Sequence, residues 1–197
     1  MNWLIIWPSA DGVRENLPIA FRKRYSKAIS TIGCFEIQIE KTSNASHQAA
    51  TWSQYKSYNT IKYLISITPD GLINFISEEY GGRTPDSTIF EDSGFLDKLV
   101  QKSIVLADRG FKNISHLLEK HGCTLLRPPS ESSNSKPSAE EVLQTKRFAA
   151  IRVHVEKSIG KLRDFKMIGL HACFLDNVVT IACGLVNLQN CLFSNQV

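Results

Sequence analysis

The stretch Thr31-Ile-Gly-Cys-Phe-Glu-Ile-Gln-Ile-Glu40 decides the fold, because its β-branched and aromatic residues alternate with residues suited to a second environment. Such alternation is typical of a paired β-strand with one strongly buried face. Gly33 interrupts the pattern, since a glycine inside a strand loses side-chain packing and costs backbone entropy. It indicates a bulge, a close approach of another segment, or a position from which a functional side chain has been lost.

Two further strands follow this one and are joined by a tight turn. Residues 61–68 (IKYLISIT) and 72–77 (LINFIS) are apolar and rich in β-formers. Between them, Pro69 presets the turn and Gly71 tolerates a positive φ, so the pattern predicts a β-hairpin. The polar residues 41–60 are expected to form a long connection from the first strand to this hairpin.

The second half of the chain alternates short strands with helices. Residues 103–107 (SIVLA) and 123–126 are short, continuous apolar runs, the pattern of strands buried on both faces. Four helices are expected. Three begin at a cap, namely Asp86, Asn113 and the capping box SAEE at 138–141, and the fourth is indicated by an apolar stripe near the C-terminus. That stripe consists of Val178, Ile181, Ala182, Leu185, Leu188 and Leu192.

This order of elements predicts an α/β fold with a mixed sheet, in which three antiparallel strands and two parallel strands are flanked by helices. The succession is ribonuclease-H-like. A length of 197 residues fits a single domain. We expect a helical lead-in at 1–28, a core at 29–165 with a mobile loop at 128–138, and a C-terminal helical segment at 166–197.

Composition excludes several classes of protein. The five cysteines show no C-x-x-C spacing, which favours reduced thiols in a cytosolic or nuclear protein over disulfides or a zinc site. The opening MNWLIIWPS has no basic region, and the apolar run at 178–193 is interrupted by polar residues, so neither a signal peptide nor a membrane span is expected. Residues 141–166 hold seven lysines and arginines against three acidic residues, which permits an anionic partner.

Two acidic residues stand where a site would form. Asp108 directly follows the buried run SIVLA, at the end of a strand where α/β sheets place their ligands. Glu156 lies about 60° around its helix from Ile159 and therefore borders the buried stripe. Each has an ordinary alternative, because Asp108 can bond to nearby amides or to Arg109, and Glu156 can pair with Arg152 one turn earlier.

Taken jointly, several motifs resemble the DDE superfamily endonuclease domain of Harbinger-like transposases, most closely the animal branch often joined to a THAP zinc finger. They are WSQYK at 52–56, NTIKYL at 59–64, GGR-x-x-D at 81–86, LADRGF at 106–111 and RVHVEKSIG at 152–160. The resemblance extends from about Trp3 to the C-terminal helix. It implies a ribonuclease-H-like nuclease that acts on DNA in the nucleus. It also implies two divalent ions, Mg²⁺ or Mn²⁺, which lie about 4 Å from each other and are held by three acids.

Carried over by position, the resemblance makes Asp108 the second acid and Glu156 the third, both as catalytic residues and metal ligands. The family writes the strand motif as I-I-D-C-F-E-I, whereas this chain has Thr31-Ile-Gly-Cys-Phe-Glu-Ile37, so Gly33 stands in the place of the first acid. We therefore expect weakened metal binding and impaired cleavage. Glu36 would replace the missing acid only through a bulge, because strand parity sends it to the other face. Asp86 is either a helix cap or an auxiliary acid.

Two alternatives to an impaired nuclease remain open at this point. One is an active enzyme that uses Glu36, Asp86 or a water-filled gap instead of the missing acid. The other is a non-catalytic DNA-binding module, in which Trp52 and Tyr55 either cover the sheet or stack on bases. The module's candidate phosphate contacts are Arg109, Arg152, Lys157 and Lys161. Because no zinc finger or helix-turn-helix precedes Trp3, we expect either a homo-oligomer or a partner that carries the DNA-recognition module.

Overall fold

The computed structural model describes residues 5–22, 25–128, 153, 155–165 and 174–189. The expected capping box at 138–141, nearly all of the expected loop at 128–138, and Arg152 lie outside these residues. Of the helix expected after the capping box, the structure describes residue 153 and residues 155–164, all of them helical. Within the described residues, no helix has the length and apolarity needed to cross a membrane.

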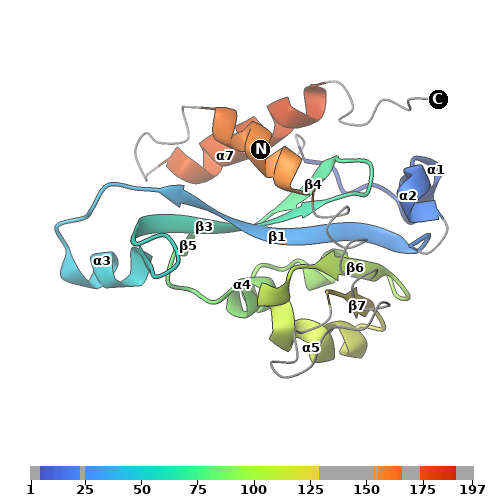
Figure 1. Cartoon of the computed structure of the whole chain (residues 1–197), viewed down its shortest axis with the longest axis horizontal. Helices are drawn as coiled ribbons and strands as arrows, with labels where there is room; N and C mark the ends of the chain where they lie inside the picture. Colours follow the sequence, from blue (N-terminus) through green and yellow to red (C-terminus); the bar gives the residue numbers. More distant parts are fainter. Residues whose placement is uncertain (1–4, 23–24, 129–152, 154, 166–173, 190–197) are drawn as a thin grey trace, which may run out of the picture.

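A single mixed sheet forms the centre of the molecule (Figure 1). Its spatial order is β2-β3-β1-β6-β7, and β4 and β5 also pair with β3. β1 runs antiparallel to β3 and parallel to β6, which runs parallel to β7. The strands are β1 (Ala28–Gln38), β2 (Trp52–Ser53), β3 (Tyr58–Ile67), β4 (Ile73–Ile76), β5 (Tyr80–Gly81), β6 (Ile104–Ala107) and β7 (Thr124–Leu126). The predicted ribonuclease-H-like mixed α/β fold is confirmed.

Helices cover both faces of this sheet, as Figure 1 shows. The helical residues 155–164 and α7 share one apolar cluster with β3 and the outer half of β1. On the opposite face, α4, η3 and α5 enclose a second cluster with β6. The helices are α1 (Ala10–Glu15), α2 (Ile19–Arg22), α3 (Ala45–Thr51), α4 (Asp86–Asp92), η2 (Leu96–Lys98), η3 (Arg109–Ile114), α5 (Ser115–Lys120) and α7 (Leu175–Leu188).

The hairpin between β3 and β4 is confirmed, with Gly71 at a φ of 98°. The prediction for residues 41–60 is wrong in part, because they hold α3, β2 and the start of β3. The cause is local: the side chain of Asn44 accepts hydrogen bonds from the amides of Ser46 and His47 and so begins α3. Polar composition alone does not reveal such a cap.

Two predicted helix caps are wrong. Pro85 is the N-cap of α4, and Asp86 is the first helical residue without a capping hydrogen bond. Its carboxylate instead bonds to Lys62, a partner 24 positions away in the sequence. Asn113 lies inside η3, and Ile114 precedes α5 without a side-chain cap.

The buried face of α7 also differs from the predicted stripe. Of that stripe, Ala182 is buried, whereas Ile181, Leu185 and Leu188 are exposed, and Leu192 lies outside the described residues. The helix instead buries Leu175, Val179, Ala182, Cys183, Gly184 and Val186. α7 is apolar on most of its circumference, so apolarity alone could not select the face.

Asn187 on α7 closes the edge of β4. Its side-chain amide donates to the carbonyl of Ile73 and its oxygen accepts from the amide of Ile73, both at 2.8 Å. Replacing Asn187 with alanine leaves these two buried backbone groups without a partner, so we expect the free energy of unfolding to fall by about 1–3 kcal/mol. Thermal unfolding measures the loss. Asn177→Ala, at an exposed position of the same helix, is the control, and equal melting temperatures for the two variants would contradict this role.

Candidate functional site

A cavity of about 700 Å³ opens where β1 and β6 separate. The pairing of these parallel strands ends at Ile32 and Ala107, while β1 continues alongside β3 to Gln38. Parallel strands that part at their carboxyl ends leave a crevice, which is the usual ligand position in α/β sheets. Three sequence-predicted positions line this cavity. Gly33 comes from β1, Asp108 directly follows β6, and Glu156 belongs to the helical residues 155–164.

Gly33 lies directly beneath the helix that carries Glu156. A Cβ atom on Gly33 would stand 3.3 Å from Cγ1 of Val155 and 4.0 Å from Cδ1 of Ile159. The pairing of β1 with β3 is continuous from Thr31 to Gln38, so the strand does not bulge here. The φ of Gly33 is not positive, so its backbone suits any residue. Of the three explanations for this glycine, a bulge is excluded, and a close approach by Val155 is present.

Asp108 and Glu156 reach the same cavity from different elements. Asp108 is half-buried immediately after β6, and its carbonyl accepts a hydrogen bond from the amide of Phe111 at 3.2 Å, which starts η3. Glu156 is exposed on the residue that follows Val155. A carboxylate at position 33 would extend from a Cβ that faces Val155, the residue next to Glu156 in the helix.

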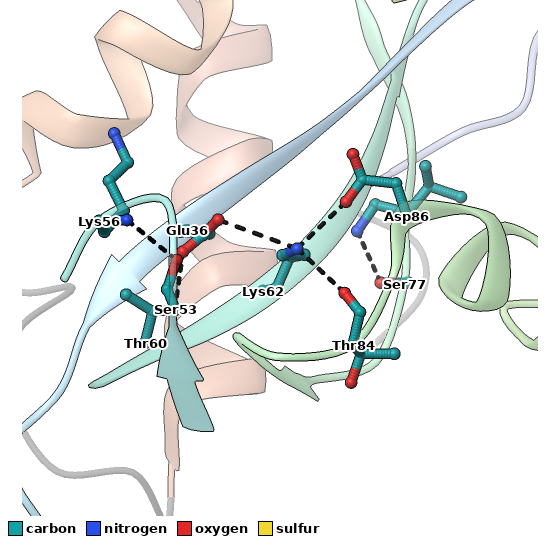
Figure 2. Close-up of polar contacts among 9 residues, drawn as sticks. Glu36, Ser53, Lys56, Thr60, Lys62, Ser77, Thr84 and Asp86 are labelled. Atoms are coloured by element: carbon teal, nitrogen blue, oxygen red, sulfur yellow. Dashed lines mark hydrogen bonds and ion pairs between the residues drawn. The ribbon is translucent and has the colours of Figure 1, made fainter. Parts of the chain in front are cut away.

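Lys62 on β3 organises the other acids of the cavity, as Figure 2 shows. Its ammonium donates to the carbonyl of Thr84 at 3.0 Å and to Oδ1 of Asp86 at 3.1 Å, and it lies 3.9 Å from Oε1 of Glu36. The hydroxyl of Thr60 donates to Oε2 of Glu36 at 2.8 Å. The side chains of Lys62 and Glu36 are only 11% and 12% exposed, and that of Asp86 is 28% exposed. We call Glu36, Lys62 and Asp86 the Lys62 cluster.

The Lys62 cluster contains Glu36 and Asp86, the two acids that could have replaced the missing ligand. The strand does not bulge, and Glu36 pairs in register with Lys62 on the sheet face opposite to Gly33, as parity predicts. Asp86 lies at the cavity rather than capping a helix, and its Oδ2 would stand 2.9 Å from a Cβ on Gly110. Because Gly110 has no side chain, the Asp86 carboxylate fits next to the segment that carries Asp108. Both acids already have Lys62 as their cation.

Cys34 also lines the cavity, on the face of the Lys62 cluster. Burial raises the pKa of its thiol well above the ordinary value, and the negative charge and hydrogen bond of Asp86 raise it further against the opposing charge of Lys62. The thiol is therefore protonated at neutral pH and is a poor nucleophile. Cys34, Cys123 and Cys183 are free, in agreement with the expected reduced thiols for this part of the chain.

Some of the candidate basic and aromatic residues line the cavity. Tyr55, Lys56 and Arg163 line the cavity, Lys157 is exposed, and Lys161 is half-buried on the same helix. The backbone of Arg109 belongs to η3, while its side chain lies outside the description. Tyr55 is 85% exposed, so the interpretation that it covers the sheet is wrong.

Sequence reasoning missed the role of Lys62, although a signal was present. A lysine within an otherwise apolar strand is rarely buried without an acidic partner. Lys62 stands in the run IKYLISIT and is buried. Its partners come from β1 and α4, so the lysine alone indicates a buried ion pair but does not identify the acidic partners.

The donors present do not fit the two-ion site that the resemblance implies. Within the described residues, no three histidine, cysteine, aspartate or glutamate side chains are grouped to hold a metal ion. Gly33 offers no donor and a methyl group of Val155 covers it, while Lys62 engages Glu36 and Asp86. Asp108 and Glu156 are the remaining carboxylates, and two ions sharing a site need more negative oxygen ligands than these.

Comparison with known proteins places the chain in a family. No curated protein matches the sequence significantly. A family model described as DDE superfamily endonuclease matches residues 32–187. That range begins one residue before Gly33, contains Asp108 and Glu156, and ends within α7. Because the match covers most of the chain, this chain belongs to the DDE superfamily endonuclease family.

Proposed function

We propose that this chain is a transposase-derived endonuclease domain of the Harbinger-like type that binds DNA and has lost most or all of its strand cleavage. The observation that supports the loss is Gly33, which stands in the place of the first acid beneath Val155. The family generally uses divalent metals, which activate the attacking water and stabilise the leaving oxygen of a phosphodiester. In this chain Asp108 and Glu156 are the proposed remaining ligands, so binding of Mg²⁺ or Mn²⁺ is weak.

DNA binding is proposed to use the basic side chains of the helix that contributes Glu156 to the cavity, together with two arginines elsewhere in the sequence. Lys157, Lys161 and Arg163 belong to the helix that lines one wall, and Arg109 and Arg152 are the further candidate phosphate contacts. Each contact releases counterions from DNA, so the affinity falls as salt concentration rises. The proposal includes a nuclear location, and either a homo-oligomer or a partner that carries the DNA-recognition module.

A plasmid-nicking assay tests the proposed loss of cleavage. We expect supercoiled plasmid incubated with Mg²⁺ or Mn²⁺ to be nicked no faster by the natural chain than by Glu156→Gln, because the site lacks its first acid. The Gln variant keeps the size of the side chain and removes its charge. Robust metal-dependent nicking by the natural chain that disappears in Glu156→Gln would refute the impairment and favour an active enzyme.

The second candidate function is a DNA-binding module without any catalytic role, and the basic helix beside the cavity favours it. If this helix contacts phosphates, Lys157→Ala and Lys161→Ala should each weaken binding to a DNA duplex. Each should also reduce the slope of log affinity against log salt concentration by about 1. Fluorescence anisotropy across a salt series measures both. Lys98→Ala, at an exposed position on η2, is the control, and affinity that does not depend on salt would contradict phosphate binding.

A further inference from the structure

We propose that the turn between β2 and β3 is a nucleobase-binding platform at the mouth of the cavity, on which the ring of Tyr55 stacks with an unpaired base of DNA. The inference rests on the proposed DNA-binding function and adds to it the form of the substrate. It concerns three neighbouring residues, Tyr55, Lys56 and Ser57, whose conformation the fold fixes although none of them belongs to the core.

Tyr55 presents its ring to solvent where the cavity opens. It is the most exposed large apolar or aromatic side chain among the described residues, at 85%. It nevertheless lines the cavity that Asp108 and Glu156 share. The ring therefore contributes little to folding, and its position beside a concave site favours a role in binding.

The turn that carries the ring is well defined by hydrogen bonds. The amide of Ser57 donates to the carbonyl of Ser53 at 2.9 Å, and the amide of Lys56 donates to the hydroxyl of Ser53 at 3.2 Å. Figure 2 shows the second of these bonds. Ser57 has a φ of 61°, which is unusual for a residue other than glycine and closes the turn tightly. Because Ser53 is buried and pairs with Tyr58, the turn is anchored to β3. A ring on an ordered turn loses less entropy when it binds a ligand.

A positive charge accompanies the ring. The ammonium of Lys56 lies 4.9 Å from the centroid of the Tyr55 ring, and Arg163 lines the cavity on another element. An exposed aromatic ring with adjacent cations is the combination that binds single-stranded nucleic acid, because the ring stacks on the base and the cations bind phosphate. Bases within a duplex are already stacked on their neighbours. The platform therefore binds a base at a single-stranded end of the DNA, or a base that is flipped out of the DNA duplex.

Two DNA probes of equal charge distinguish stacking from phosphate binding. One is a fluorescently labelled single-stranded oligothymidylate, and the other is a labelled abasic deoxyribose-phosphate strand of the same length. We expect Tyr55→Ala to weaken binding of the oligothymidylate about 5- to 100-fold while its affinity for the abasic strand stays unchanged. Tyr55→Phe keeps the ring and should retain the natural affinity. Leu188→Ala, which truncates an exposed apolar side chain on α7, is the control.

The outcomes separate this inference from the proposed function. Equal oligothymidylate affinity for Tyr55→Ala and the natural chain overturns the platform and leaves DNA binding in place. An equal loss with both probes also overturns it, because the side chain would then act on the backbone or on the turn. Absence of binding by the natural chain to either probe and to duplex overturns the proposed DNA-binding function, and the platform with it.

Discussion

Replacing Lys62 by methionine is expected to lower the free energy of unfolding by about 3–5 kcal/mol, the usual cost of leaving buried charges without their partner. Lys62 lies 3.1 Å from Asp86 and 3.9 Å from Glu36, and its side chain is 11% exposed. Methionine keeps most of the apolar length of the side chain, so the loss reports the ammonium rather than a cavity. The carbonyl of Thr84 also loses its donor. Chemical denaturation followed by circular dichroism measures the change.

Two further variants show whether the loss comes from the unpaired carboxylates. Lys41→Met makes the same substitution at an exposed lysine, and we expect a change within about 0.5 kcal/mol. Adding Glu36→Gln and Asp86→Asn to Lys62→Met removes both negative charges and should recover a substantial part of the stability. A Lys62→Met variant as stable as Lys41→Met would show that the Lys62 cluster does not hold these acids.

Restoring an acid at position 33 is expected to raise metal-dependent plasmid nicking at least about 100-fold, because a bound divalent ion supplies several kcal/mol of transition-state stabilisation. Gly33→Asp places a carboxylate on the face of β1 that meets the helix bearing Glu156. The aspartate Cβ would stand 3.3 Å from a methyl group of Val155, so the helix must shift by a few tenths of an ångström. Some loss of stability should therefore accompany the gain, and Val155→Ala should relieve it.

The matched control for this gain is Gly33→Asn, which adds nearly the same volume without the charge. We expect no increase in nicking for Gly33→Asn. Glu156→Gln or Asp108→Asn in the Gly33→Asp background should abolish the increase, since the proposed site needs all three acids. If Gly33→Asp/Val155→Ala folds and binds DNA but does not nick it, the missing acid at position 33 is not what prevents cleavage.

The parts of the fold that depend on short-range patterns could be predicted from the sequence. The turn at Pro69 and Gly71 brought β3 and β4 together, and the apolar run SIVLA became β6. Strand parity correctly separated Gly33 from Glu36, because successive side chains on a strand point to opposite faces. These features follow from local backbone geometry, which the identities of neighbouring residues determine.

The rest depends on contacts that a single sequence does not specify. Asp86 is of a residue type that often caps helices, but it is the first residue of α4, and its carboxylate accepts a hydrogen bond from Lys62 on β3. The buried face of α7 was missed because nearly every face of that helix is apolar, and the clusters on the sheet select one. The approach of Val155 to Gly33 also depends on how a distant helix docks, so the sequence could indicate a missing acid but not what lies over its position.

Calorimetric titration of Mn²⁺ into the natural chain and into Gly33→Asp tests the central claim most directly, namely that Gly33 marks a lost metal ligand. The account predicts tight binding to Gly33→Asp alone, and weak binding both to the natural chain and to Gly33→Asn. Mn²⁺ binding of equal strength to the natural chain and to Gly33→Asp would contradict the account, because another side chain would then complete the metal site.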